Sequence, residues 1–164
     1  MTYEEIRVVF VVYLAVFMPL IIYILYRKKL PNWIPSFYLV ALVVCALGWE
    51  LWFTYGWLDG DPVDLRRSDN LNTWLPKNIN WLLNSMGDAG SVLLGGVLLM
   101  WLTHGRDSKV FREWKWSAFA VLFIWCIGQN IIVEIFLYHD QLAVGKPLSW
   151  APLSFFGPYY NPVI

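Results

Sequence analysis

Three acidic side chains lie inside long apolar stretches of this sequence: Glu50, Asp88 and Glu134. An ionised carboxylate at the centre of a membrane costs at least ~2.5–3.5 kcal/mol unless it is neutralised, paired or in contact with water. No Lys or Arg lies inside the same stretches to pair with these acids. Acids in such a setting can exchange a proton with a ligand or hold a cation, so they are the first candidates for chemistry.

The polar residues of these stretches fall at similar depths. With a rise of 1.5 Å per helical residue, we expect Glu50 ~10 Å, Asp88 ~13 Å and Glu134 ~6 Å from the same end of their helices. Gln129 and Asn130 are expected ~12–13 Å from that end. Polar residues scattered by chance would not align in this way, so the depths predict one cavity in one half of the bilayer.

The helical faces agree with this prediction. Spacings of three and four residues place one polar stripe on a single face of a helix, formed by Asn80, Asn84, Asp88 and Ser91. Spacings of four do the same for Asn130 and Glu134, and for Glu50 and Thr54. The simpler alternative is that these groups only join helices by hydrogen bonds. Each such bond averages ~0.6 kcal/mol, and neutral amides would suffice for it.

An aromatic run surrounds the first acid, in the segment WELWFTYGW over residues 49–57. An indole face beside an acid stabilises a cation, so Trp49 and Trp52 are candidates for the same cavity. The alternative is that these rings pack the core and anchor the chain at the membrane interface.

The elements that must position these residues are four apolar segments long enough to cross a bilayer, which takes ~20 helical residues. They run over residues 8–26, 37–57, 79–103 and 116–138. Hydrophobic residues make up 59% of the chain and charged residues 15%, as is typical of membrane proteins. We therefore predict an all-α polytopic membrane protein, a four-helix bundle forming a single domain over residues 1–164, with a proline-rich interfacial tail over residues 139–164.

The loops predict an orientation. The 27–35 loop carries three basic residues and no acid, and the 104–115 loop carries four, namely Arg106, Lys109, Arg112 and Lys115. The remaining extramembrane segments together carry five. The positive-inside rule then places both termini on the non-cytoplasmic side. The 58–78 loop is rich in turn-forming residues and is expected to be solvated.

Several classes of function are not supported. A net charge of zero gives no electrostatic support for nucleic-acid binding. Cys45 and Cys126 lie in apolar segments and predict no disulfide framework. His104 and His139 are expected at opposite ends of the bundle, so they cannot form a metal site together. We expect no metal and no cofactor. Membrane lipids and a hydrophobic small molecule are the expected partners, and a homo-oligomer or a membrane protein partner is left open.

Short motifs over roughly residues 45–161 resemble the EXPERA superfamily, which includes emopamil-binding protein and the sigma-2 receptor. Trp49-Glu50-Leu51-Trp52-Phe53 resembles its acidic motif before an aromatic pair, and Met86-Gly87-Asp88 with Ser91 resembles its acid followed by a hydroxyl. Gly128-Gln129 with Glu134 resembles its Gly-Gln segment followed by an acid. In the last region of the EXPERA superfamily, an asparagine faces the pocket. That region is similar to the segment of this chain that contains Gly145-Lys146-Pro147, Phe155-Phe156 and Asn161.

This resemblance implies a water-poor pocket for a sterol-like or isoprenoid ligand. Glu50 and Asp88 would form an acid/base pair for an isomerase, or for a cyclase like the small membrane terpene cyclases. The implied ligand-binding residues, together with those proposed above, are Trp49, Trp52, Thr54, Asn84, Ser91, Gln129, Asn130, Glu134 and Asn161.

Two alternatives to an enzyme stay open. One is a non-catalytic binder of a lipid or an amine, and the other is an accessory subunit of a larger membrane complex. The isomerases have a histidine where this chain has Ala46, which favours the binder over a true isomerase.

Overall fold

The computed structural model describes residues 1–56 and 62–133, and every regular element in that part of the chain is helical. This confirms the all-α prediction for the described residues. The elements in chain order are α1 (Tyr3–Tyr26), η1 (Arg27–Lys29), α2 (Ile34–Leu47), α3 (Trp49–Tyr55), α4 (Val63–Arg66), α5 (Asp69–Trp74), α6 (Lys77–Gly87), η2 (Asp88–Leu94), α7 (Gly95–Thr103), η3 (Ser108–Phe111) and α8 (Trp116–Ile132). η1 and η3 are 3-10 helices, and η2 is a π-helix.

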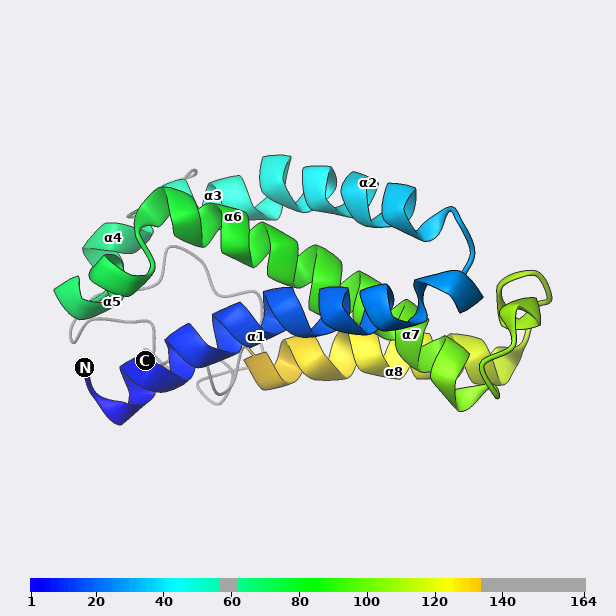
Figure 1. Ribbon diagram of the computed structural model, residues 1–164. Helices are drawn as coiled ribbons and strands as arrows, with labels where there is room; N and C mark the ends of the chain where they lie inside the picture. Colours follow the sequence, from blue (N-terminus) through cyan, green and yellow to red (C-terminus); the bar gives the residue numbers. More distant parts are fainter. Residues whose placement is uncertain (57–61, 134–164) are drawn as a thin grey trace.

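The helices run alternately up and down an elongated bundle (Figure 1). α1 and the stretch α6–η2–α7 run in one direction, whereas α2–α3 and α8 return in the other. The stretch α6–η2–α7 is central, because it contacts α1, α2, α3 and α8. It therefore holds the bundle together, and the polar stripe predicted on it faces neighbouring helices.

Three helical stretches are long and apolar enough to cross a membrane: Tyr3–Lys29, Ile34–Tyr55 and Lys77–Thr103. They contain most of the first three predicted spans. α8 is apolar and begins at Trp116, where the fourth predicted span begins, and its described part is shorter than a full span. Residues 134–138 of that span and the predicted tail over 139–164 lie outside the described residues.

The second predicted span is not one continuous helix, because the chain breaks at Gly48. α2 ends at Leu47 and α3 begins at Trp49, with Gly48 between them at φ −101° and ψ −110°. A Cβ atom at this position would lie 2.7 Å from the carbonyl oxygen of Val44. Only glycine fits here without a backbone shift, and the break starts a new helix directly before Glu50.

A proline and a serine join α1 to the central stretch. Pro19 lies inside α1 and has no N–H to donate to the carbonyl of Ala15, four residues earlier. The Ser91 hydroxyl donates a 3.0 Å hydrogen bond to that carbonyl instead. Gly90 lies against the same carbonyl, since a Cβ there would be 3.2 Å from it. The backbone group that Pro19 leaves free in an apolar setting is thus satisfied by the neighbouring helix.

Side chains of α8 satisfy carbonyl groups of the π-helix η2 in the same way. The Trp125 indole N–H donates to the carbonyl of Ser91 at 2.7 Å, and the Cys126 thiol donates to the carbonyl of Val92 at 3.6 Å. A π-helix bonds residues five apart and is rare, often marking a functional site. Here it begins at Asp88, one of the predicted site residues.

The described part of the 58–78 loop is ordered and packed, so the prediction of a solvated loop is wrong for it. α4 and α5 bury Arg66 and Arg67, which are 2% and 4% exposed. Arg66 donates to the carbonyl of Phe53 and lies over its ring, 4.8 Å from the centroid. Arg67 donates to Asn80 Oδ1 at 2.9 Å. Burial lowers the pKa of Arg67 to about 10, so its guanidinium group stays charged at neutral pH.

The same segment is tied to the start of α1 and to α6. The Ser68 hydroxyl donates to the carboxyl group of Glu5. The Lys77 ammonium group pairs with Asp64 at 2.8 Å. Turn-forming residues favour a solvated loop, but they also cap short helices, as Ser68 does for α5.

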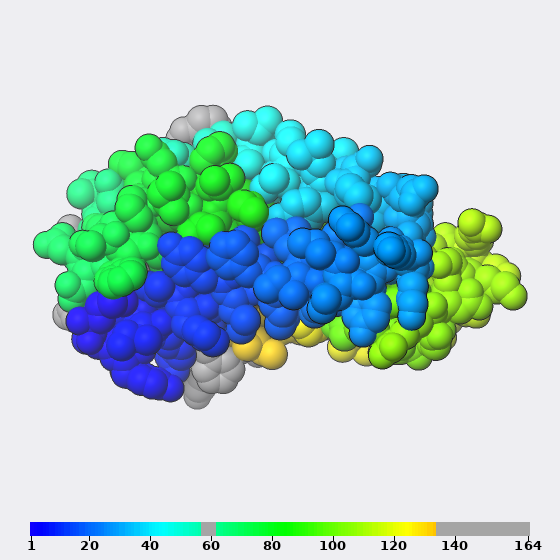
Figure 2. All heavy atoms as spheres, in the orientation of Figure 1, coloured from blue at the N-terminus to red at the C-terminus, as the bar shows by residue number. Residues whose placement is uncertain are grey.

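The two basic loops lie together at the opposite end of the bundle. The Ser108 hydroxyl donates to the carbonyl of Lys29 at 3.2 Å, and the rings of Trp33 and Phe111 meet edge to face at 5.6 Å. The segment between α7 and α8 projects beyond the helices at this end (Figure 2).

We predict that Gly48→Ala destabilises the protein, whereas Gly128→Ala does not. The methyl group at position 48 would clash with the Val44 carbonyl, which should cost about 1–3 kcal/mol. A Cβ at Gly128, within α8, would meet nothing within 4 Å and should stabilise the helix by about 0.5–1 kcal/mol. Thermal unfolding in detergent measures both. Equal melting temperatures for the two variants would contradict the tight break at Gly48.

Candidate functional site

A cavity of about 680 Å³ lies between α1, α3, the α6–η2 stretch and α8. Its volume falls in the range of about 300–1,000 Å³ that is typical of small-molecule sites. Seven of the residues predicted from the sequence line it: Trp49, Glu50, Asn84, Asp88, Ser91, Gln129 and Asn130. The structure therefore brings together polar groups from three helices that are far apart in the sequence.

The walls are mainly apolar. Val12 and Ala15 of α1, Phe53 of α3, Leu83 of α6 and Ile127 of α8 contribute to them. None of the described lining residues is Lys, Arg or His. The arrangement is that of a hydrophobic cavity with a few polar groups at defined places, as small-molecule pockets usually have.

Glu50 is the more enclosed of the two carboxyl groups, with 3% of its surface exposed. The Thr54 hydroxyl, one turn further along α3, donates to it at 3.5 Å. Asn84, on α6, lines the same cavity as Glu50. Glu50 is thus oriented by a neutral donor from its own helix.

Asp88 is the first residue of η2 and is half-buried. Its carboxyl group lines the same cavity as that of Glu50. No hydrogen bond to the Asp88 carboxyl is found from the described residues. Two carboxyl groups so placed repel each other when both are ionised, so a proton or a cation between them is favourable.

The cavity also contains an amide group that has no partner among the described residues. The Gln129 Nε2 atom is buried and makes no hydrogen bond to any described residue. A buried donor left in this state costs ~1–3 kcal/mol, which calls for an explanation such as a ligand. Asn130, by contrast, donates to the carbonyl of Cys126 in its own helix at 2.6 Å.

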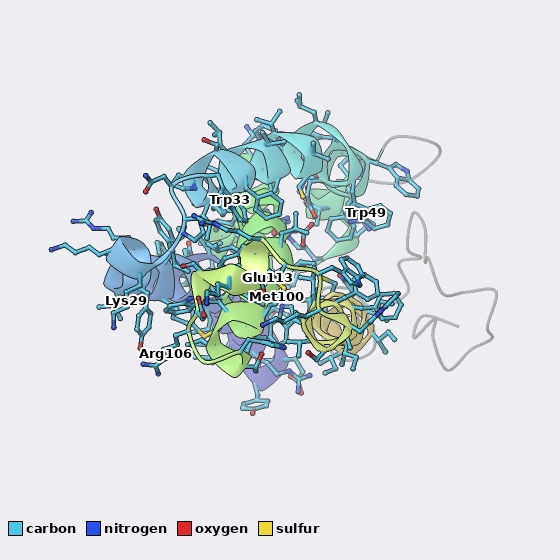
Figure 3. The ribbon with its side chains drawn as sticks, turned by 90° about the vertical axis from the view of Figure 1, so that its right-hand side faces the viewer. Lys29, Trp33, Trp49, Met100, Arg106 and Glu113 are labelled. Carbon is cyan, nitrogen blue, oxygen red and sulfur yellow. The ribbon has the colours of Figure 1, made fainter. Side chains whose placement is uncertain are left out.

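Other predicted residues have different surroundings. Thr54 lies behind Glu50, fully buried, and is not part of the lining. Trp52 is also outside the lining and packs edge to face on Trp49, with ring centroids 4.9 Å apart. Figure 3 shows Trp49 on the side of the bundle that α8 also occupies. Glu134 and Asn161 lie outside the described residues.

Sequence reasoning missed the contribution of α1, whose Val11, Val12 and Ala15 line one wall. The available signal was Pro19, because a proline inside a helix frees the carbonyl four residues before it and so marks a contact. Cys45, which the sequence places in an apolar segment, also lines the cavity. Ser91 was interpreted as a ligand contact, and its hydroxyl is already bonded to α1.

Comparisons with protein-family models, with curated proteins and with solved structures found no match to this chain. The resemblance to the EXPERA superfamily therefore stays a prediction.

Proposed function

We propose that this chain is a multi-pass membrane protein that binds a hydrophobic ligand of sterol-like or isoprenoid type in the cavity between its helices. One observation carries the proposal: Glu50 and Asp88, from different helices, face one apolar cavity whose described lining contains no basic side chain. The ligand would fill the apolar volume and present a polar or cationic group to the two acids.

A purely structural role explains the two acids poorly. Neutral residues already join the helices here, as Ser91 does with α1 and Trp125 with η2. Each hydrogen bond of this kind averages ~0.6 kcal/mol, whereas an ionised acid at mid-membrane costs ~2.5–3.5 kcal/mol. Two carboxyl groups without a basic partner therefore destabilise the bundle. Amide side chains could join the helices equally well without this cost.

The geometry supports two kinds of use. In the first, an isomerase or a cyclase, one carboxyl group donates a proton to an alkene or epoxide and the other accepts a proton elsewhere on the ligand. In the second, a non-catalytic binder, the acids hold the ammonium group of a lipophilic amine. The aromatic rings of Trp49 and Phe53, which line the cavity, would stabilise a positive charge in either case.

We predict that Glu50→Gln and Asp88→Asn each weaken the binding of a lipophilic tertiary amine, such as dodecyldimethylamine, at least tenfold, which is about 1.4 kcal/mol. Both substitutions keep the shape of the side chain and remove its charge. Their melting temperatures should stay the same or rise, because a buried ionisable group is costly. Titration of the protein in nanodiscs of zwitterionic lipid measures the affinity.

The matched control is Glu113→Gln, which removes an exposed acid in the loop before α8 and should leave amine affinity unchanged. If Glu50→Gln and Asp88→Asn unfold the protein while their residual folded fraction binds the amine normally, the acids are structural and the proposal fails.

We also propose that α8 continues into a fourth span and that both termini face the non-cytoplasmic side. The contact between the two basic loops supports this orientation, because seven basic residues then share one face of the membrane.

Single cysteines test the orientation. In a Cys45→Ala/Cys126→Ala background, Asp69→Cys should react in intact cells with a membrane-impermeant maleimide, and Glu113→Cys should react only after lysis. Both positions are exposed, so accessibility does not limit labelling. Labelling of Glu113→Cys from outside the cell would reverse the topology.

A further inference from the structure

Seven basic side chains gather at the end of the bundle formed by η1, η3 and the segment before α8. They are exposed, and they are Arg27, Lys28, Lys29, Arg106, Lys109, Arg112 and Lys115. Only two acids, Asp107 and Glu113, lie in the same two loops. Among the described residues, no ion pair joins any of the seven to an acid, so their charge is available to a partner.

The basic side chains at the opposite end of the bundle have different surroundings. There Arg66 and Arg67 are buried against carbonyl and amide oxygens, and Lys77 pairs with Asp64. The described part of the molecule is therefore asymmetric, with uncompensated positive charge at one end only.

The basic end is a fixed surface. One buried apolar cluster lies beneath both loops, and it includes Leu30, Ile34, Trp101 and Val110. The Ser108 hydroxyl ties the second loop to the carbonyl of Lys29. The cations are thus held near one another despite their mutual repulsion, at a cost that an anionic partner would offset.

Arg106 shows how this surface is built. It adopts a left-handed conformation with φ 59°, uncommon for a residue other than glycine, and its N–H bonds the carbonyl of Trp101 at 3.0 Å. Its guanidinium group lies over the ring of Tyr26, 5.4 Å from the centroid, at the end of α1. Figure 3 shows Arg106 and Lys29 on the same side of this end of the bundle.

A series of exposed aromatic rings leads from the same surface along α8. Trp114 and Trp116, 66% and 73% exposed, meet edge to face at 5.2 Å, and Phe119 and Phe123 continue the series. Tryptophan prefers the head-group level of a bilayer. These rings place the neighbouring cations at the depth of lipid phosphates.

We infer that this surface, termed here the basic platform, binds the phosphate head groups of acidic phospholipids. The ligand is a lipid rather than a soluble anion because the aromatic series sets the platform at the membrane surface, where anionic head groups are concentrated. This inference does not depend on the cavity or its ligand.

The test compares the protein in nanodiscs of phosphatidylcholine with nanodiscs that also contain phosphatidylglycerol. Native mass spectrometry after release counts the lipids of each type that the protein retains. The wild type should retain phosphatidylglycerol in preference to phosphatidylcholine, and the preference should decline as NaCl is added. A variant carrying Lys28→Gln, Lys29→Gln, Lys109→Gln and Arg112→Gln should lose the preference.

The matched control keeps the charge and changes the side chains, through Lys28→Arg, Lys29→Arg, Lys109→Arg and Arg112→Lys. It should retain phosphatidylglycerol as the wild type does. Equal retention of the two lipids by the wild type, or an unchanged preference in the glutamine variant, would overturn the inference. Displacement of the lipid by inorganic phosphate alone would overturn it too, since the platform would then be a site for a free anion. The salt titration of the wild type decides the question if the glutamine variant does not fold.

Discussion

Two carboxyl groups that share an apolar cavity impose the main constraint on this molecule. Glu50 and Asp88 come from different helices, and no basic side chain among the described lining residues neutralises them. The protein partly offsets the cost of Glu50, because the Thr54 hydroxyl donates a hydrogen bond to this carboxyl group. On the other side, Asp88 lines the cavity, and no described residue donates a hydrogen bond to its carboxyl group.

The irregular points of the helices lie next to these two acids. The break at Gly48 begins a new helix directly before Glu50, and the π-helix η2 begins at Asp88. Irregular backbone in an apolar setting needs other partners for its polar groups. Side chains from the adjacent helices provide them: Ser91 bonds the carbonyl that Pro19 leaves free, and Trp125 bonds a carbonyl of η2. The same bonds that satisfy the backbone thus fix the walls of the cavity.

The sequence predicted which residues share a helical face, because helical periodicity determines this. Spacings of four predicted that Asn84 and Asp88 share a face, and both line the cavity. Asn80, on the same stripe, instead accepts a hydrogen bond from the buried Arg67. Periodicity gives the face of a helix, and it does not say which neighbour meets that face at each depth.

Other features depend on contacts between distant segments. The apolar pattern continues through Gly48, so it gave no sign of the break. Arg66 and Arg67 read as solvated loop residues, because their acceptors, such as the carbonyl of Phe53, become available only once the chain has folded. The roles of Glu134 and Asn161 depend on residues that the structure does not describe.

Native mass spectrometry of the protein extracted from its own membrane tests the central claim most directly, because it asks whether the cavity is occupied without presupposing the ligand. The wild type should carry one hydrophobic molecule small enough for a cavity of about 680 Å³, and Asp88→Asn should carry much less of it. A wild type without any such molecule, or one that the Asp88→Asn variant retains equally, would contradict the claim that these acids form a ligand site.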